Sequence, residues 1–289
     1  MEADVGGGAG TARLSVLLPV WAGDDADHLA TAFRSVTDEQ TQPPDQVVIV
    51  RDGPVGATLQ ARIDELAAAA AVPVDVVALE HNGGLGPALD AGLAACRHEF
   101  VARMDADDIS LPHRFATQLP IMESGIDLLG SGLLEFGADL DDVVGTRTPP
   151  VTAADIAARS RFASPFNHPT VVYRRELVQA VGGYGAFALM EDYLLWAKLI
   201  MIGARVANVA EPLVAYRVGA GAYARRGGWA QLRAELALQW RFRALGFTTP
   251  AQFLRNVAVR GGYRLVPETL RRTAYRRVIA TYPAGNPQV

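Results

Sequence analysis

Cysteine, lysine and long hydrophobic segments are almost absent from this sequence. Its one cysteine, Cys96, excludes an internal disulfide and fits a reducing compartment. No apolar run approaches the roughly 20 residues that cross a bilayer, and the acidic, glycine-rich start lacks the layout of a signal peptide. We therefore expect a cytoplasmic protein. With 289 residues, half of them hydrophobic, the chain has room for one large α/β domain with an appendage.

The basic residues are unevenly distributed. Lys198 is the only lysine, so arginine supplies nearly all positive charge. From Arg217 onward there are 13 arginines and only two acidic residues, a balance of +11, whereas residues 1–216 carry −15. This basic C-terminal region predicts an anionic partner: phospholipid head groups, a pyrophosphate-linked lipid or nucleic acid.

The first hundred residues alternate between two kinds of segment. Four continuous apolar runs are typical of strands buried on both faces of a parallel sheet, and three helix-like segments separate them. The runs are residues 14–19, 46–51, 74–79 and 100–104, and the helix-like segments are 27–36, 58–70 and 85–96. This order predicts an open α/β sheet of the Rossmann type, in which ligands bind at the carboxyl ends of the strands.

The segments that follow three of these strands carry candidate binding residues. The first strand ends at Pro19, Val20 and Trp21, and the second ends at Asp52. The third runs into the glycine-rich residues 80–86, which form either a phosphate-binding nest or a sharp turn into a helix.

Three aspartates follow the fourth strand. Asp105, Asp107 and Asp108 lie within four residues, where their charges repel one another unless a cation or hydrogen-bond donors hold them. Carboxylate oxygens favour Mg²⁺ or Mn²⁺, and such an ion in turn favours a pyrophosphate-bearing substrate. Alternatively, one aspartate caps the helix that Pro112 is expected to start.

A second acidic group lies further along the chain. Glu191 and Asp192 precede a helix-like segment ending at Ile202, so Asp192 is either its N-terminal cap or a general base in a sugar-binding pocket near Tyr193 and Trp196.

Together these motifs resemble glycosyltransferase family 2, and most closely bacterial exopolysaccharide enzymes of the amylovoran-biosynthesis type. The resemblance covers about residues 13–217. It rests on residues 14–20, 50–53, 82–92, 103–108, 166–170, 182–184 and 191–193. It implies a GT-A fold and inverting transfer of a sugar from a nucleotide-diphosphate donor, with uracil as the expected base, to a hydroxyl of a glycan or polyprenyl-linked acceptor.

The resemblance also implies roles for individual residues. Asp192 would be the general base, with Glu191 beside it contacting a sugar. Asp107 would bind Mn²⁺ or Mg²⁺ directly, and Asp105 would contact the metal or the ribose. The residues implied in donor binding are Pro19, Val20, Trp21, Asp52, Asn82, Gly84, Arg103, Met104, Asp105 and Ala106. Acceptor or diphosphate contacts are expected from His168, Trp196 and Arg217, with a plain role in a turn as the alternative for His168.

Two positions depart from the family pattern. Asp90 stands where many relatives have Asn. Many relatives also carry a His soon after a Tyr-Arg pair like Tyr216-Arg217, whereas here no His follows His168. The missing contact then comes from His168, Tyr223, Arg225 or Arg226, or from water.

The last quarter of the chain forms a separate region. We expect a disordered start at 1–12, a GT-A catalytic domain at 13–217 and a basic, mainly helical region at 218–289. A helix at 228–245 carries Trp229, Leu232, Leu236 and Trp240 at helical spacing. This stripe either packs on the catalytic domain or rests on an anionic membrane surface, together with the later arginines. These are Arg255, Arg260, Arg264, Arg271, Arg272, Arg276 and Arg277.

Two other functions compete with sugar transfer. A sugar-phosphate nucleotidyltransferase shares the α/β sheet and acidic metal ligands, but residues 21–25 are acidic where a triphosphate-binding loop is basic. A non-catalytic nucleotide or nucleic-acid binding module would not need both acidic groups. We therefore expect a metal-dependent glycosyltransferase without a nucleic-acid partner, cytoplasmic or peripheral on the inner face of the membrane.

Overall fold

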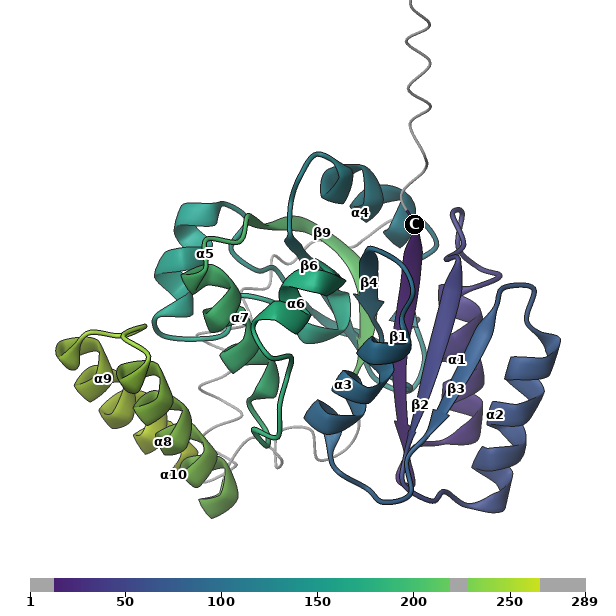
Figure 1. Ribbon diagram of the computed structural model, residues 1–289, viewed down its shortest axis with the longest axis horizontal. Helices are drawn as coiled ribbons and strands as arrows, with labels where there is room; N and C mark the ends of the chain where they lie inside the picture. Colours follow the sequence, from purple (N-terminus) through teal and green to yellow (C-terminus); the bar gives the residue numbers. More distant parts are fainter. Residues whose placement is uncertain (1–12, 219–227, 266–289) are drawn as a thin grey trace, which may run out of the picture.

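The computed structural model describes residues 13–218 and 228–265, which form one mixed nine-stranded sheet with flanking helices (Figure 1). Its strands are β1 (Leu14–Trp21), β2 (Gln46–Asp52), β3 (Val74–Ala78), β4 (Phe100–Arg103), β5 (Ile109–Ser110), β6 (Leu128–Phe136), β7 (Val143–Arg147), β8 (Val172–Arg174) and β9 (Val206–Arg217). The longer helices are α1 (Ala26–Val36), α2 (Ala57–Ala69), α3 (Leu85–Ala95), α4 (Arg114–Glu123), α5 (Ala153–Ser160), α7 (Glu191–Met201) and α8 (Trp229–Ala244). The shorter ones are η1 (His168–Thr170), α6 (Arg175–Ala180), α9 (Pro250–Asn256), η3 (Val257–Gly261) and α10 (Gly262–Leu265). None of these described helices is long and apolar enough to cross a membrane.

The first half of the sheet is parallel, as predicted. Its strand order is β3-β2-β1-β4, and each of the three predicted helices begins and ends within one residue of the expected position. Alternate side chains of β1 belong to two separate cores: Val16 and Leu18 pack on the side of α1 and α2, and Leu17 packs on the side of α3. Burial on both faces explains why these strands are continuous apolar runs.

The second half of the sheet is mixed and returns a late part of the chain to the site. Strand β8 pairs antiparallel with both β4 and β6, while β9 runs parallel to β6 and antiparallel to β5. The β5–β9 pairing places Ala215 opposite Ile109, directly after the three aspartates. Residues about 110 positions apart in the sequence therefore meet at one edge of the sheet.

The described part of the C-terminal region is helical and covers α7. Leu238 and Phe242 of α8 pack in one cluster with Tyr193 and Leu194 of α7. Glu235 is fully buried beside them and pairs with Arg260 and Arg264. Figure 1 shows α8 to α10 at the end of the molecule away from β3.

Of the two alternatives for the tryptophan stripe, packing on the catalytic domain is not what the structure shows. Trp229 and Trp240 are 70% and 64% exposed. Leu232 and Leu236 lie against Gly261 instead, where an added Cβ would be 3.5 Å and 3.9 Å from their methyl groups. The face of α8 that packs on α7 carries Leu238 and Phe242. It lies about one third of a turn around the helix from Leu232 and Leu236. The predictions for residues 1–12, for Tyr223, Arg225 and Arg226, and for the arginines after Leu265 concern positions outside the described residues.

Candidate active site

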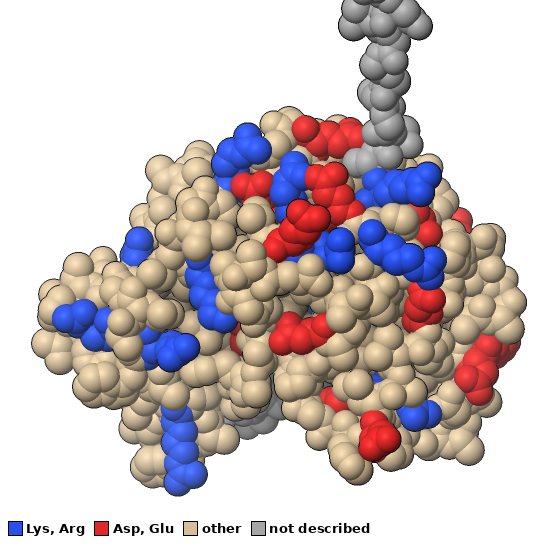
Figure 2. Space-filling model, viewed as in Figure 1, with Lys and Arg blue, Asp and Glu red and all other residues tan. Residues whose placement is uncertain are grey.

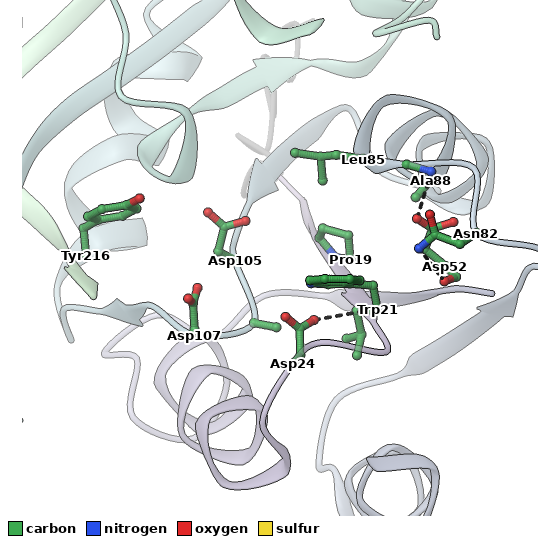
Figure 3. Close-up of a pocket in the computed structure, with 13 residues that line it drawn as sticks. Pro19, Trp21, Asp24, Asp52, Asn82, Leu85, Ala88, Asp105, Asp107 and Tyr216 are labelled. Carbon is green, nitrogen blue, oxygen red and sulfur yellow. Dashed lines mark hydrogen bonds between the residues drawn. The ribbon is translucent and has the colours of Figure 1, made fainter. Parts of the chain in front are cut away.

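A cavity of about 350 Å³ opens where the parallel strands end, as the sheet topology requires. Nine of the predicted site residues line it: Pro19, Val20, Trp21, Asp52, Asn82, Gly84, Asp105, Ala106 and Asp107. Figure 3 shows the carboxylates of Asp105, Asp107 and Asp24 lying between the rings of Trp21 and Tyr216. The cavity thus combines two aromatic walls with an acidic floor.

The turn between β1 and α1 holds Trp21 at the cavity wall. The Trp21 backbone N–H donates to the Asp24 carboxylate at 2.9 Å, and the Asp24 N–H donates to the Trp21 carbonyl at 3.0 Å. The indole lies on the backbone of Gly23, where a Cβ would overlap the ring. The ring is half exposed and stands free for a flat partner. Burial raises the pKa of Asp24 to about 6, and the charges of Asp107 and Asp105 contribute to that rise.

Asp52 joins β2 to the start of α3. Its two carboxylate oxygens accept hydrogen bonds from the backbone N–H groups of Gly83 and Gly84, at 2.7 Å and 3.0 Å. Each oxygen retains a second lone pair for another donor. The glycine-rich residues 80–86 therefore form a turn into a helix whose amide groups are held by a side chain.

The three aspartates converge, with one carboxylate oxygen from each lying within 4.8 Å of the others. None of them caps α4, because that helix begins at Arg114 after His113 and has no side-chain cap, so the capping interpretation is wrong. Burial, followed by the charges of Asp105 and Asp107, raises the pKa of Asp108 well above its ordinary value. Such a group favours a bound positive charge.

Two arginines fix the geometry of this acidic group. Arg103 is 2% exposed and pairs through both terminal nitrogens with Asp105. The backbone N–H of Arg217 donates to Asp108 at 2.9 Å, and its guanidinium donates to the Asp107 carbonyl at 3.0 Å. The resemblance implied donor binding for Arg103 and an acceptor or diphosphate contact for Arg217. Neither side chain lines the cavity, and their bonds to the aspartates and to the Asp107 carbonyl orient the turn.

The aspartate group fits a divalent cation. It offers hard oxygen donors, and the Oδ2 atom of Asp108 is buried without a hydrogen-bond partner among the described residues. Asp105 is already engaged by Arg103, so Asp107 and Asp108 are the carboxylates better able to hold the ion. Asp108 was not among the metal ligands expected from the sequence.

Glu191 and Asp192 form the first turn of α7, beside the α3 wall of the cavity. A Cβ on Gly86 of α3 would lie 3.5 Å from the Glu191 Cβ and would overlap the Gly185 carbonyl, so glycine permits this close approach. Burial raises the pKa of Asp192, and burial together with the charge of Asp192 raises that of Glu191 to about 7. The helix begins at Glu191, so Asp192 is not its cap.

Asp90 connects α3 to the loop that leads into this acidic pair. Its two oxygens accept hydrogen bonds of 2.8 Å from the backbone N–H groups of Tyr184 and Gly185. An aspartate where many relatives have Asn thus supplies two acceptors to two donors. Carboxylates therefore fix helix α3 at two points, its start through Asp52 and its middle through Asp90.

Seven predicted residues do not line the cavity: Arg103, Glu191, Asp192 and Arg217, described above, and Met104, His168 and Trp196. Trp196 is fully buried, with its ring 5.7 Å from that of Phe166, so its expected acceptor contact is not possible in this structure. Met104 is also buried, because it packs in the core next to Arg114. His168 contacts the Tyr184 hydroxyl at 3.3 Å and does not join the aspartate group among the described residues. Burial and the charge of Arg103 lower the pKa of His168, so it stays neutral.

Sequence reasoning missed four residues of the cavity. These are Asp24, Leu85, Ala88 and Tyr216. Asp24 follows a predicted strand end, and Leu85 and Ala88 begin a predicted helix, so their positions carried a usable signal. Tyr216 arrives through the β9 pairing and had no such local signal.

Solved structures identify the class of fold. The chain has a TM-score of 0.59 with Staphylococcus aureus TarS 1-349 in complex with UDP-GlcNAc, at 20% identity over 78% of this chain and 65% of that one, slightly less than two thirds of its length. It has a TM-score of 0.60 with the mannosyltransferase PcManGT of Pyrobaculum calidifontis in complex with GDP-Man and Mn²⁺, at 17% identity over 93% of this chain and 76% of that one. The fold is that of the GT-A glycosyltransferases, as predicted.

Sequence comparison then gives the family. The model of glycosyl transferase family 2 matches residues 15–182. The amylovoran biosynthesis glycosyltransferase AmsE of Erwinia amylovora is 37% identical over 78% of this chain and 83% of its own. The UDP-Gal:alpha-D-GlcNAc-diphosphoundecaprenol beta-1,3-galactosyltransferase of Escherichia coli is 34% identical over 94% of this chain and 98% of its own. The chain belongs to glycosyltransferase family 2, and the resemblance found in its motifs is confirmed.

Proposed function

We propose that the protein is an inverting, metal-dependent enzyme that moves a sugar from a UDP-sugar to a hydroxyl of a lipid-linked glycan in cell-surface polysaccharide synthesis. The observation that carries this proposal is the cavity between Trp21 and Tyr216, with the aspartate group at one side and the first turn of α7, which carries Glu191 and Asp192, beside its α3 wall. Two relatives support the substrates: one is named for a UDP-Gal donor and a diphosphoundecaprenol acceptor, the other for amylovoran synthesis.

The chemistry assigns a task to each group. Trp21 would stack on the uracil, and Asp52 would accept a hydrogen bond from it through a free lone pair. Asp107 and Asp108 would hold Mn²⁺ or Mg²⁺, which offsets the charge on the departing diphosphate. Asp192 would take the proton of the attacking hydroxyl from the face opposite the leaving group, and a single displacement of this kind inverts the anomeric carbon.

Calorimetric titration tests the donor site. UDP, dTDP and GDP are titrated into the full chain with Mn²⁺ and then with EDTA. We expect UDP to bind with Mn²⁺ and to bind more weakly in EDTA. Binding of GDP alone would change the donor series, and binding of none of the three would reject the donor site.

The competing functions lose support from the comparisons. Relatives that cover more than 90% of this chain are named as glycosyltransferases and not as nucleotidyltransferases. A non-catalytic role is disfavoured because the fold brings the two acidic groups close enough for the charge of Asp105 to act on Glu191 and Asp192. Turnover of a nucleoside triphosphate and a sugar phosphate, without sugar transfer, would restore the first alternative.

Removal of a metal ligand is the first testable substitution. In Asp107→Ala we expect UDP to bind about tenfold or more weakly than to the wild type in Mn²⁺, because a direct carboxylate ligand is lost. In EDTA the two proteins should bind UDP equally, and this comparison is the internal control. Equal affinities in Mn²⁺ would remove Asp107 from the metal site.

A second substitution tests the support of the acidic pair. Asp90→Asn keeps one acceptor and turns an amide group toward the other N–H, so one hydrogen bond is lost, at a cost of about 1 kcal/mol. We expect kcat to fall while the affinity for UDP stays at the wild-type value, because the loop before Glu191 shifts and the cavity does not. Asp64→Asn, on the exposed side of α2, is the control. A parallel loss of UDP affinity would mean that α3 itself has moved.

A lipid-linked acceptor also bears on where in the cell the protein acts. We propose that the protein acts at the inner face of the cell membrane as a peripheral protein, because UDP-sugars and reducing conditions belong to the cytoplasm. Cys96 is buried and unpaired, as expected there.

A further inference from the structure

The outer surface of α8 to α10 carries positive charge only. Between Gly228 and Leu265 the sequence has one acidic residue, Glu235, which is buried between Arg260 and Arg264. Those two arginines share the single negative charge of Glu235 inside the fold. The arginines that remain exposed are Arg233, Arg241, Arg243 and Arg255. Figure 2 shows Lys and Arg but no Asp or Glu on the visible face of α8 and α9.

Exposed tryptophans lie among these arginines. At 100° per residue, Trp229, Arg233 and Trp240 point to the same side of α8, within about 40° of one another. That side faces away from Leu238 and Phe242, which pack on α7. The two indoles are 11 residues apart, about 16 Å along the helix. They form a strip of aromatic and basic side chains on the outer side of the helix.

The apolar surface continues onto the neighbouring helices at both ends of this strip. The ring of Trp240 lies 4.8 Å from that of Phe253 in α9, and the next residue, Leu254, is 66% exposed. At the other end, the Gly228 N–H donates to the Arg264 carbonyl at 3.2 Å, so the backbone leading into exposed Leu265 is near the one leading into Trp229. We call Trp229, Arg233, Trp240, Leu254 and Leu265 the α8–α9 face.

We propose that the α8–α9 face docks on a lipid bilayer with anionic head groups. Indole rings prefer the boundary between head groups and acyl chains, and arginines near an anionic surface gain electrostatic attraction. Leu254 and Leu265 favour a bilayer over nucleic acid, because aliphatic side chains gain free energy in the acyl boundary and none from phosphates. The proposal deepens the proposed function only in naming the surface that meets the membrane.

Docking on this face would place the reaction close to the bilayer. Helix α8 packs on α7, whose first turn carries Glu191 and Asp192. Figure 1 shows that α8 begins on the side of the molecule where the parallel strands end. A glycan attached to a membrane lipid therefore has only one helix layer between its anchor and the carboxylates.

Vesicle sedimentation of the full chain tests the face. The vesicles contain phosphatidylcholine with about 30% phosphatidylglycerol, at low salt, where exposed charges are least screened. We expect the wild type to sediment with them. Trp229→Ala with Trp240→Ala should lower the partition coefficient about tenfold or more, through lost apolar contact. Arg233→Gln should lower it about fivefold.

Matched controls isolate this surface. Trp21→Ala removes an exposed indole from the cavity instead, and Arg97→Gln removes an exposed arginine at the amino end of β4. Both should sediment with vesicles like the wild type. Trp229→Ala alone serves as a second variant, because Trp240 also contacts Phe253 and its loss could loosen α9.

Each other outcome overturns the proposal. It fails if the wild type does not sediment with anionic vesicles. It also fails if the wild type sediments and the α8–α9 face variants sediment equally well, since residues outside this face, 266–289 included, then make the contact. Tight binding of a random oligonucleotide in place of vesicles would make the face a nucleic-acid surface. UDP titration of the same proteins separates this result from the donor site, because vesicle binding without UDP binding rejects only the proposed function.

Discussion

The Asp192→Asn variant should bind UDP with the wild-type affinity and lose about 10²- to 10⁴-fold in kcat. Asparagine keeps the size and the position in the first turn of α7 but cannot take a proton, and a positioned general base contributes a factor of this order. Initial rates with a UDP-sugar and an acceptor, alongside UDP titration, measure the two quantities separately. Full turnover by the variant would remove Asp192 from the role of base.

The pH dependence of the wild type gives the same assignment a second test. Burial raises the pKa of Asp192 above its ordinary value of 3.8, and only the ionised carboxylate accepts a proton. Activity should therefore fall as the pH drops through this raised value, at a higher pH than for an exposed aspartate. The residual activity of Asp192→Asn should lack that acidic limb.

Glu191→Gln is the matched control for the base. The pKa of Glu191 is about 7, so near neutral pH a large fraction of this side chain is already protonated and can act as a hydrogen-bond donor. Glutamine imitates that form. We expect kcat to fall less than tenfold, and a loss as large as that of Asp192→Asn would transfer the role of base to Glu191.

Replacing Glu235 with Gln should lower the free energy of unfolding by about 3–5 kcal/mol, the usual cost of removing one partner from a buried ion pair. Arg260 donates to both carboxylate oxygens, and Arg264 donates to one of them at 3.0 Å. Without the carboxylate, two largely buried guanidinium groups lose their counter-charge. Urea denaturation followed by circular dichroism measures the change.

An exposed ion pair provides the control for this prediction. Glu211→Gln breaks the pair with His113, in which both side chains are about half exposed, and should cost less than about 1 kcal/mol. If Glu235→Gln costs no more than this control, the buried cluster does not stabilise the C-terminal helices.

Acid should act on the Glu235 cluster in a defined direction. Burial alone would raise the pKa of Glu235, but the hydrogen bond and charge of Arg260 outweigh it and hold the pKa below its ordinary value of 4.5. The stabilisation is then fully present above about pH 5 and is lost as the pH falls through the depressed value. The stability difference between wild type and Glu235→Gln should shrink only below about pH 4.5.

The parallel half of the sheet was predictable because its pattern is local. A strand buried on both faces must be apolar at every position, as Val47 to Val50 are. A continuous apolar run therefore predicts such a strand. Once the strands were predicted, the residues at their carboxyl ends could be predicted as site residues. Asp52 and Asp107 were predicted in this way. Tyr216 could not be found in this way, because its position depends on the pairing of β9 with β5.

The helical faces were less predictable, because their spacing alone does not say what covers them. Trp196 lies one turn after Asp192 and points to nearly the same side, but that turn is covered by Phe166 and Tyr184. In α8 large apolar side chains occur on every side. The sequence therefore did not indicate whether the side with Trp229 or the side with Phe242 is buried. Glu235 pairs with arginines 25 and 29 residues later, and this pairing buries the side of α8 that carries Glu235 and Phe242.

Because α8 packs over α7, it limits how far the chain can be truncated from its C-terminal side. Every residue placed here in donor binding or proton transfer lies before Val218, which suggests that the chain could be shortened to its first three quarters. Deletion after Val218 would uncover Tyr193 and Leu194, the two residues that follow Asp192. A chain that ends just before Arg264 would keep Glu235 but lose one of its two arginine partners. A shortened enzyme that holds Asp192 in place must therefore extend to Leu265.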